Sequence, residues 1–504
     1  MLAKGAPDAY VPAMTAQFAF DNSFARDLEG FYARVAPTPV ASPRIVKFNA
    51  ALAEELGLDA AMLQSEIGAA IFSGNAPPPG ADPIAMAYAG HQFGHFVPQL
   101  GDGRAILLGE VVGRDGIRRD IQLKGAGPTP FSRRGDGRAA LGPVLREYLI
   151  SEAMHALGIP ATRALAAVTT GEEVYRERAL PGAVFTRVAR SHIRVGTFQF
   201  FAVRSDVSSL TRLADYVIAR HYPHLADREN KYLALLDAVM ERQAQLVSRW
   251  MMVGFIHGVM NTDNMAVSGE TIDFGPCAFM DAYDPLTVFS SIDEMGRYAY
   301  ANQAPIAQWN LARFAETLLP LIDADREKAI AIATERVVGF TGLFKLHWLS
   351  GMRAKLGLAC AEEGDEALVQ DLLDQMQASR ADFTLTFRQL GELAVGSAPE
   401  SLRGQFLDLA RFDGWTDRWK DRLARDGRSL QDAAAAMQRV NPAFIPRNHL
   451  VEDALAHAVE RGDMAMFEEM LSVLSRPYDA QPAHARYAAP PPLDFGPYRT
   501  FCGT

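Results

Sequence analysis

The stretch from Phe255 to Gly275 constrains this chain most, because it places polar side chains at fixed intervals between apolar segments. Asn264 lies seven residues after His257, and Asp273 follows nine residues later at the start of an Asp-Phe-Gly turn. Amide and carboxylate oxygens are ligands that Mg²⁺ accepts in proteins. Either half of the stretch alone could be an ordinary turn. The two halves at this separation, after a long helical pattern, predict a metal-dependent site.

Protein kinases use the same spacing of His, Asn and Asp, with Asn and Asp as metal ligands and a catalytic carboxylate two residues after the His. In this chain that position is Val259, and the nearest carboxylate is Asp263, four residues further on. Valine cannot accept a proton. The sequence therefore predicts a kinase-like metal site from which the usual base has moved.

The composition is that of a globular protein with an acidic balance. Its 60 Asp and Glu side chains exceed its 50 Lys and Arg side chains, which gives a formal net charge of −10. This balance argues against a general binder of nucleic acids or anionic membranes. The N-terminus lacks the apolar stretch of a signal peptide, and no run approaches the ~20 apolar residues of a membrane span. We therefore expect a cytoplasmic protein without nucleic-acid or membrane partners.

The cysteines and histidines give little support for a zinc site. Cys277, Cys360 and Cys502 are too few for a secreted disulfide framework and lack the spacing of metal ligands. His91 and His95 lie four residues apart and could bind a metal, but no carboxylate or third ligand is near them in the sequence. We expect these two histidines to pack or to form hydrogen bonds.

Residues 105–138, which precede the stretch from Phe255 to Gly275, indicate a phosphate-binding site. The apolar run at 105–112, the hairpin signal at 113–116 and a returning strand at 119–124 predict a strand pair that ends at Lys124. The segment 125–138 is rich in Gly, Pro and Arg and should form a loop. Its arginines could be solvated surface charges. Among glycines in an acidic protein, however, they favour the binding of a phosphate.

A helix that carries a carboxylate follows this loop. Pro143 near the first helical position and Gly158 after the last one predict a helix over 144–157. Glu147 on this helix could be an ordinary surface carboxylate, which is the commoner fate of Glu. It could also pair with Lys124, as kinases pair a strand lysine with a glutamate of the next helix.

The rest of the chain is mostly helical in pattern. Strands are expected at 173–179 and 183–188, separated by Leu180-Pro-Gly182. An apolar stripe at three- and four-residue steps predicts a helix at 232–252 that leads into the catalytic stretch. Further helices are expected after it, with a Pro-broken loop at 440–449.

With these residues in place, the chain closely resembles the selenoprotein O (SelO) family of pseudokinases over nearly its whole length. The strings that carry the resemblance are AGHQFGH at 89–95, QLGDGR at 99–104, QLKGAGPTPFSRRGDGR at 122–138, GVMNTDNM at 258–265 and DFGPC at 273–277. The resemblance implies a flipped ATP and an enzyme that transfers AMP to Ser, Thr or Tyr hydroxyls of proteins, with release of pyrophosphate.

The fold implied by the resemblance is α+β and protein-kinase-like, with a mixed small lobe, a helical large lobe and an extension at each end. The expected parts are an N-terminal extension at 1–80, a small lobe at 81–195 with Lys124 and Glu147, a large lobe at 196–475 with the catalytic loop at 255–275, and a C-terminal tail at 476–504 with Cys502.

The resemblance also implies a role for each site residue. Lys124 would contact phosphate and pair with Glu147, and Asp263 would be the catalytic base. Asn264 and Asp273 would ligate Mg²⁺ or Mn²⁺. The residues expected to bind the nucleotide are Gly101, Gly103, Arg104, Lys124, Asp136, Gly137, Arg187, Arg194 and Asp273, with Arg187 and Arg194 on its phosphates.

Two other functions stay open. A catalytically silent, ATP-binding pseudokinase scaffold would keep Lys124 and Asp273 but would not need Asp263 or the arginines. A true kinase would need a base near Val259. The sequence leaves the protein substrates, the choice between ATP and UTP, the choice between Mg²⁺ and Mn²⁺ and the oligomeric state undetermined.

The cysteines gain a second interpretation from the family. Its eukaryotic members carry selenocysteine near the C-terminus, where this chain has Cys502, and Cys277 follows Asp273 by four residues. Isolated cysteines in a cytosolic protein are more often inert. Because the resemblance links the C-terminal position to redox behaviour, we expect a reversible disulfide between Cys277 and Cys502 that gates substrate access. Cys360 should stay free.

Overall fold

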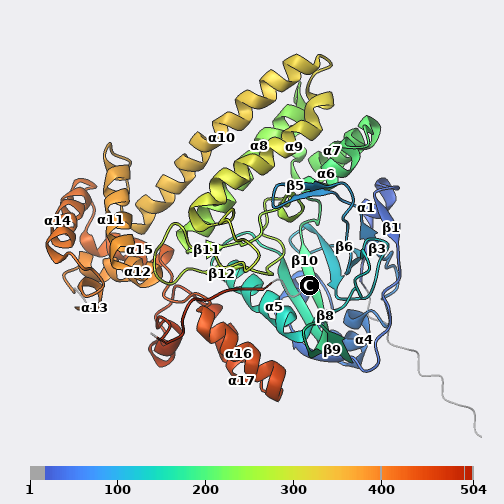
Figure 1. Cartoon of the computed structure of the whole chain (residues 1–504), viewed down its shortest axis with the longest axis horizontal. Coiled ribbons are helices and arrows are strands. Elements are labelled where there is room, and N and C mark those ends of the chain that lie inside the picture. The colour runs from blue at the N-terminus through green and yellow to red at the C-terminus, as the bar shows by residue number, and fades with distance from the viewer. Residues whose placement is uncertain (1–17, 398–399, 493, 502–504) are drawn as a thin grey trace, which may run out of the picture.

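The computed structural model describes residues 18–397, 400–492 and 494–501. Within them the chain combines one large antiparallel sheet with a mainly helical remainder, so the structure is mixed α and β (Figure 1). No helix of these residues is both long and apolar enough to cross a membrane.

The sheet has eight strands. Seven follow one another in the spatial order β1 (Tyr32–Arg34), β3 (Ile84–Met86), β6 (Ala105–Val112), β7 (Arg118–Lys124), β10 (Ala179–Ala189), β9 (Arg163–Tyr175) and β2 (Arg44–Phe48), and β8 (Ala139–Ala140) pairs with β10. The expected strand pair is confirmed as β6 and β7, with Ala105 opposite Lys124. Since β1 and β2 precede residue 80, the sheet includes part of the segment that we expected to be an N-terminal extension.

The predicted strand at 183–188 lies within β10, but the bounds predicted for the strand before it and the position of the turn are wrong. β9 ends at Tyr175 and β10 begins at Ala179, so the turn falls at 176–178 and Leu180-Pro-Gly182 lies inside β10. The register shifts between Pro181 and Ala183. Such a bulge accommodates a proline, which has no N–H for the ladder. The turn signal of Pro-Gly therefore marks an irregularity within a strand.

Helix α5 (Leu141–Ala156) confirms the predicted helix and covers one face of the sheet. Its Leu145, Tyr148 and Leu149 share a core with Phe185 of β10. Two C-terminal helices, α16 (Asn448–Arg461) and α17 (Ala465–Leu474), pack against α5 in the same core (Figure 1). A separate core joins the sheet to the N-terminal helices α2 (Ala50–Glu55), α3 (Ala60–Leu63) and α4 (Glu66–Ser73).

Long helices form the part of the molecule that follows the sheet. They are α6 (Val195–Ala202), α7 (Val207–His221), α8 (Lys231–Met252), α9 (Gln303–Ile322) and α10 (Arg326–Lys355). Helix α8 confirms the apolar stripe predicted at 232–252, and its buried face lies in the largest core with α6, α7 and α9. It leads directly into the stretch from Phe255 to Gly275.

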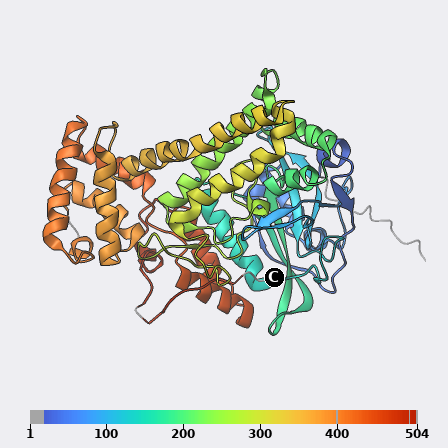
Figure 2. The ribbon, with the colours of Figure 1, turned by 45° about the horizontal axis from the view of Figure 1, so that its top comes forward.

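A second group of helices lies at the end of α10 that points away from the sheet (Figure 2). It comprises α11 (Asp365–Ser379), α12 (Phe383–Ala394), α13 (Glu400–Arg403), α14 (Leu409–Arg425) and α15 (Leu430–Val440). These helices share their own core around Trp415 and Trp419. The expected loop at 440–449 is confirmed between α15 and α16.

Short elements complete the fold. They are the helix α1 (Ser23–Asp27), the hairpin strands β4 (Gly90–Gln92) and β5 (His95–Val97), the strands β11 (Phe255–Ile256) and β12 (Ala278–Phe279), and the 3₁₀ turns η1 (Pro223–Leu225), η2 (Thr262–Asn264), η3 (Tyr300–Asn302) and η4 (Pro482–Tyr487). The strands β11 and β12 pair with each other and enclose the catalytic stretch.

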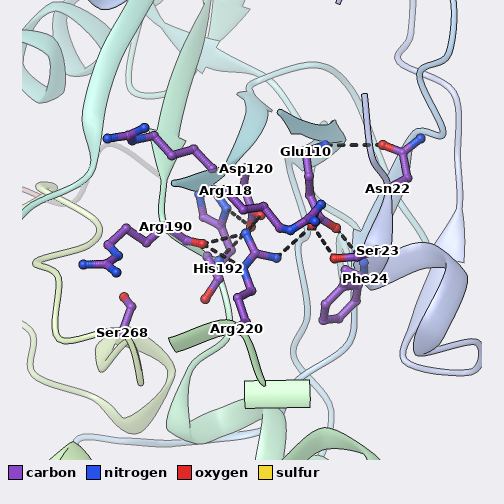
Figure 3. Close-up of polar contacts among 12 residues, drawn as sticks. Asn22, Ser23, Phe24, Glu110, Arg118, Asp120, Arg190, His192, Arg220 and Ser268 are labelled. Carbon is purple, nitrogen blue, oxygen red and sulfur yellow. Dashed lines mark hydrogen bonds and ion pairs between the residues drawn. The ribbon is translucent and has the colours of Figure 1, made fainter. Parts of the chain in front are cut away.

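A buried network of charges joins α1 and α7 to the sheet (Figure 3). Glu110 of β6 accepts hydrogen bonds from the Phe24 amide at 2.6 Å and the Ser23 hydroxyl at 2.7 Å. Arg220 of α7 donates to Glu110 at 3.0 Å and to Asp120 of β7 at 2.5 Å. We call these five residues the anchoring cluster. Its charges satisfy one another, which fixes the strands that lead to Lys124.

Candidate active site

A lysine, a glutamate and an aspartate meet where the sheet faces the helical part. Lys124 ends β7, and its Nζ lies 2.7 Å from Oε2 of Glu147 in the second turn of α5. Lys124 also forms an ion pair with Asp273. Asp273 has a φ of 70°, a left-handed conformation that is uncommon for a residue other than glycine. The Asp-Phe-Gly turn thus aims its carboxylate at the sheet.

Two buried arginines add positive charge beside this group. Arg187 of β10 donates from Nε to Oε1 of Gln122 at 2.7 Å, and its Nη1 has no hydrogen-bond partner. That Nη1 lies 3.5 Å from Oε1 of Glu147 and 3.7 Å from Oδ1 of Asp273. Burial would raise the pKa of Asp273, but Lys124 and Arg187 hold it well below its usual value. The Asp273 carboxylate is therefore ionised at any physiological pH.

Arg194, the residue before α6, is held in place through one edge of its guanidinium. Nη1 donates to the backbone carbonyl of Asp263 at 2.9 Å, and the guanidinium lies 4.4 Å from the ring centroid of Tyr88. Nη2 has no hydrogen-bond partner in the protein, although Arg194 is only 2% exposed. Buried polar groups are normally paired, so the N–H groups of Arg187 and Arg194 indicate an anion-binding site.

Asp263 lies in the 3₁₀ turn η2 and is 7% exposed. Gln92 donates to its Oδ2 at 3.1 Å, whereas its Oδ1 has no partner. Burial raises the pKa of Asp263 to about 6. A carboxylate with one unpartnered oxygen and a pKa near neutrality can take up a proton from a bound hydroxyl.

The hairpin β4–β5 supports this carboxylate. A Cβ at Gly90 would lie 2.5 Å from Oδ1 of Asp263, so only glycine lets the hairpin come this close. The His91 amide donates to the Thr262 hydroxyl at 2.7 Å, and the His91 ring is hydrogen-bonded to Gln199 at 2.8 Å. The expected hydrogen-bonding role of His91 is confirmed. His95 is exposed at the other side of the hairpin.

Two oxygen donors suit a divalent cation. Asn264 donates from Nδ2 to the carbonyl of Val259 at 3.0 Å, which leaves its side-chain oxygen as an acceptor. Asn264 and Asp273 line the same cavity. No cluster of three or more His, Cys, Asp or Glu side chains suited to a metal occurs among the described residues. The pair fits Mg²⁺ or Mn²⁺, which need only a few protein oxygens when phosphate and water supply the rest.

Two cavities meet at these residues. The inner cavity, of about 620 Å³, is lined by every residue that the sequence assigned to the nucleotide: Gly101, Gly103, Arg104, Lys124, Asp136, Gly137, Arg187, Arg194 and Asp273. The outer cavity, of about 1150 Å³, contains Glu147, Val259 and Asn264. Both are lined by Gln92, Arg104, Lys124, Arg133, Asp263 and Asp273. The candidate base therefore lies where a basic chamber opens into a wider one.

The loop 125–138 closes over the inner cavity and has no regular secondary structure beyond turns, as predicted. Gly137 has a φ of 67°, and a Cβ there would lie 2.1 Å from the Gly127 carbonyl carbon. The carboxylate of Asp136 accepts from Arg176 at 2.8 Å and from the Arg138 amide at 2.9 Å. The loop is thus folded back on itself by close backbone contact.

Comparison with known proteins agrees with this arrangement. The profile of the family described as "Protein adenylyltransferase SelO" matches residues 14–475. A protein of Rhizobium rhizogenes named "Protein nucleotidyltransferase YdiU" is 65% identical over 486 residues, which cover 96% of this chain and 97% of that protein. Proteins of the same name from Bradyrhizobium diazoefficiens and Rhizobium meliloti are 62% and 63% identical, and each aligned region covers 97% of this chain and 100% of its relative. The chain belongs to the SelO family.

Several residues that contribute to the candidate active site of this SelO-family protein were not identified from the sequence. Gln122 holds Arg187, Gln92 holds Asp263, and Tyr88 stacks on Arg194. Asp102 accepts from Gln122 at 3.1 Å and lies 3.9 Å from Arg194. Gln92, Gln122 and Asp102 stand within the strings that carry the resemblance. Their position in those strings was the only available signal, since a glutamine or a tyrosine gives no chemical one.

The cysteines have different surroundings. Cys277 is fully buried, and burial raises the pKa of its thiol to about 12. Cys360 is an exposed, free thiol, as expected. Cys502 lies outside the described residues, so the Cys277–Cys502 disulfide stays a prediction. The nearby Thr500 contacts the segment around Cys277, because its hydroxyl donates to the Pro276 carbonyl at 2.6 Å.

Proposed function

We propose that this protein transfers AMP from ATP to hydroxyl side chains of other proteins and releases pyrophosphate. The observation that carries the proposal is that Asp263, Arg187 and Arg194 line one cavity and that each has a buried polar atom without a hydrogen-bond partner. Membership of a family described as protein adenylyltransferases supports it.

The residues divide the reaction between them. Lys124, Arg187 and Arg194 hold the triphosphate end of ATP in the inner cavity, where their positive charge is fixed before the substrate binds. Asp263 accepts the proton of the acceptor hydroxyl, and the hydroxyl oxygen attacks the α-phosphorus. The bond from that phosphorus to the bridging oxygen breaks, and pyrophosphate leaves. Glu147 holds Lys124 in position throughout.

Asn264 and Asp273 would hold Mg²⁺ or Mn²⁺ at this site. The cation would neutralise negative charge on the phosphates. The carboxylate of Asp273 is ready for this role because Lys124 and Arg187 keep it ionised.

The fold that we propose is kinase-like and bilobal. A strand lysine paired with a glutamate on the next helix, and an Asp-Phe-Gly turn facing both, is the arrangement that protein kinases use. On this basis residues 81–195 are the small lobe, 196–475 the large lobe and 476–504 a C-terminal tail, with 1–80 before them.

Incubation of the protein with ATP labelled on either the α- or the γ-phosphate tests the function. We expect label from the α-phosphate on acceptor protein and none from the γ-phosphate. Label from the γ-phosphate would identify a kinase instead. Binding of ATP without transfer of either label would identify a pseudokinase scaffold, which is the alternative that the sequence left open.

We also propose that Cys277 and Cys502 form a reversible disulfide over the active site. The contact between Thr500 and Pro276 supports it, since it brings the described end of the tail to the residue before Cys277. Peptide mapping under non-reducing conditions after mild oxidation should yield the linked peptide. Its absence, or equal transferase activity with and without reductant, would exclude this gate.

A further inference from the structure

Arg146 occupies an unusual place beside the candidate active site. It precedes Glu147 on α5, is 8% exposed, and its guanidinium contacts the C-terminal part of the chain. Nη2 donates to the Cys277 carbonyl at 2.5 Å. Nη1 donates to Oε1 of Glu452 at 3.0 Å and to the Tyr498 hydroxyl at 2.8 Å. One side chain thus contacts the segment after Asp273, helix α16 and the C-terminal residues.

Further hydrogen bonds connect the C-terminal residues 494–501 to α16 and to the segment around residue 290. The Tyr498 hydroxyl donates to Glu452 at 2.5 Å. The Thr500 amide donates to the Phe289 carbonyl at 2.8 Å, and the Thr500 carbonyl accepts from the Ser291 amide at 2.9 Å. Six residues of the C-terminal segment also line the outer cavity: Phe495, Pro497, Tyr498, Arg499, Thr500 and Phe501. A displacement of residues 494–501 would therefore reach α5 through Arg146.

We infer that Arg146 is a positioning residue that couples residues 494–501 to the Lys124–Glu147 ion pair. The inference rests on the proposed function, because it concerns the same site. Arg146 and Glu147 are consecutive on one helix, so the three contacts that hold the nearly buried guanidinium of Arg146 restrain the turn that carries Glu147. The C-terminal segment completes the active site when its tyrosine and Glu452 hold Arg146 in place.

The stability of α5 has a different origin. Leu145, Tyr148, Leu149 and Met154 on α5 are fully buried among apolar side chains. Loss of the Arg146 contacts should leave α5 folded and change the position of its first turns. A misplacement of about 1 Å in a catalytic constellation can reduce turnover by about 10²-fold. The expected defect is therefore in kcat.

Three variants and a matched control test the inference. The variant Arg146→Met should lower kcat by about 10²-fold and change KM for ATP by less than about threefold. The kcat of Arg146→Lys should be about tenfold higher than that of Arg146→Met, since lysine can restore one of the contacts. Tyr498→Phe should lower kcat by about threefold and add nothing to Arg146→Met in the double variant. The control is Arg163→Met, because Arg163 joins the far end of α5 to β9 through Glu152 at 2.8 Å without touching the tail.

Hydrogen exchange over residues 494–501 provides a second readout, because coupling is reciprocal. A non-hydrolysable ATP analogue should slow exchange at Thr500 by about fivefold or more in the wild type and in Arg163→Met, but not in Arg146→Met. An unchanged response in Arg146→Met, or a fall in its kcat no greater than that of the control, overturns the inference. If the wild type binds the analogue but transfers no label, the proposed function fails and the exchange response alone decides this inference.

Discussion

The anchoring cluster and the candidate active site bury similar charges on the same sheet, yet they differ in how these charges are satisfied. In the anchoring cluster both carboxylate oxygens of Glu110 and of Asp120 accept hydrogen bonds, and every guanidinium nitrogen of Arg220 donates one (Figure 3). In the active site Glu147, Asp263, Arg187 and Arg194 each keep a polar atom without a hydrogen-bond partner. A satisfied cluster holds the fold together, whereas an unsatisfied one is suited to a ligand.

The largest expected effect comes from the candidate active site. Replacing Asp273 by Ala should reduce transfer of AMP by about 10³-fold, because the metal ligand and the partner of Lys124 are lost together. The thermal unfolding midpoint should stay close to that of the wild type. The matched control is Asp413→Ala, which breaks an exposed ion pair with Arg403 at 2.7 Å. Activity of Asp273→Ala equal to that of this control would remove Asp273 from the site.

The anchoring cluster should respond in the opposite way. Arg220→Met should lower the free energy of unfolding by about 3–5 kcal/mol, because it removes the nearest cation from two buried carboxylates, Glu110 and Asp120. The kcat of the remaining folded protein should change little. Denaturant unfolding followed by activity per folded molecule measures both quantities. A large loss of kcat with normal stability would show that the two clusters do not divide their roles as we describe.

A smaller effect should follow from pH. Burial raises the pKa of Asp263 to about 6, and only the ionised carboxylate can accept a proton. The rate of transfer should therefore fall about tenfold per unit as pH decreases below about 6. Asp263→Asn should remove this acid limb along with most of the activity. An acid limb near pH 4 in the wild type would indicate a base in a more exposed position.

The smallest effect is expected at Val259. Introducing a carboxylate by Val259→Asp should not produce transfer of the γ-phosphate, because the basic inner cavity determines which phosphorus meets the acceptor. Labelling with γ-labelled ATP, with wild type as the control, detects such transfer directly. Robust labelling of acceptor protein by Val259→Asp would mean that the position of the base, and not the pose of the nucleotide, selects the reaction.

Sequence patterns predicted the parts of the site that depend on local order. The apolar run at 105–112 and the hairpin signal after it lead to Lys124. Pro143 and Gly158 delimit the helix that carries Glu147, and the spacing after His257 yields Asn264 and Asp273. The supporting contacts were not predictable in this way. Gln92 reaches Asp263 across 171 residues of sequence, and only the folded chain brings the hairpin β4–β5 against the turn η2.

The strand positions near residue 180 teach a similar lesson. Pro181 and Gly182 predict a turn, because proline has no N–H and glycine is flexible. Pairing with β8 and β9 keeps β10 extended through both residues, and a bulge accommodates the proline. The local signal correctly marked an irregularity in the backbone, but pairing with the neighbouring strands made it a bulge and not a turn.

The most direct test of the account is a crystal structure of the Asp263→Asn variant with ATP and Mg²⁺. The account predicts that oxygens of the β- and γ-phosphates lie within hydrogen-bond distance of Lys124, Arg187 and Arg194 in the inner cavity. The α-phosphate should then be the phosphate nearest to residue 263. Adenine in the inner cavity, with the γ-phosphate nearest to residue 263, would contradict the account.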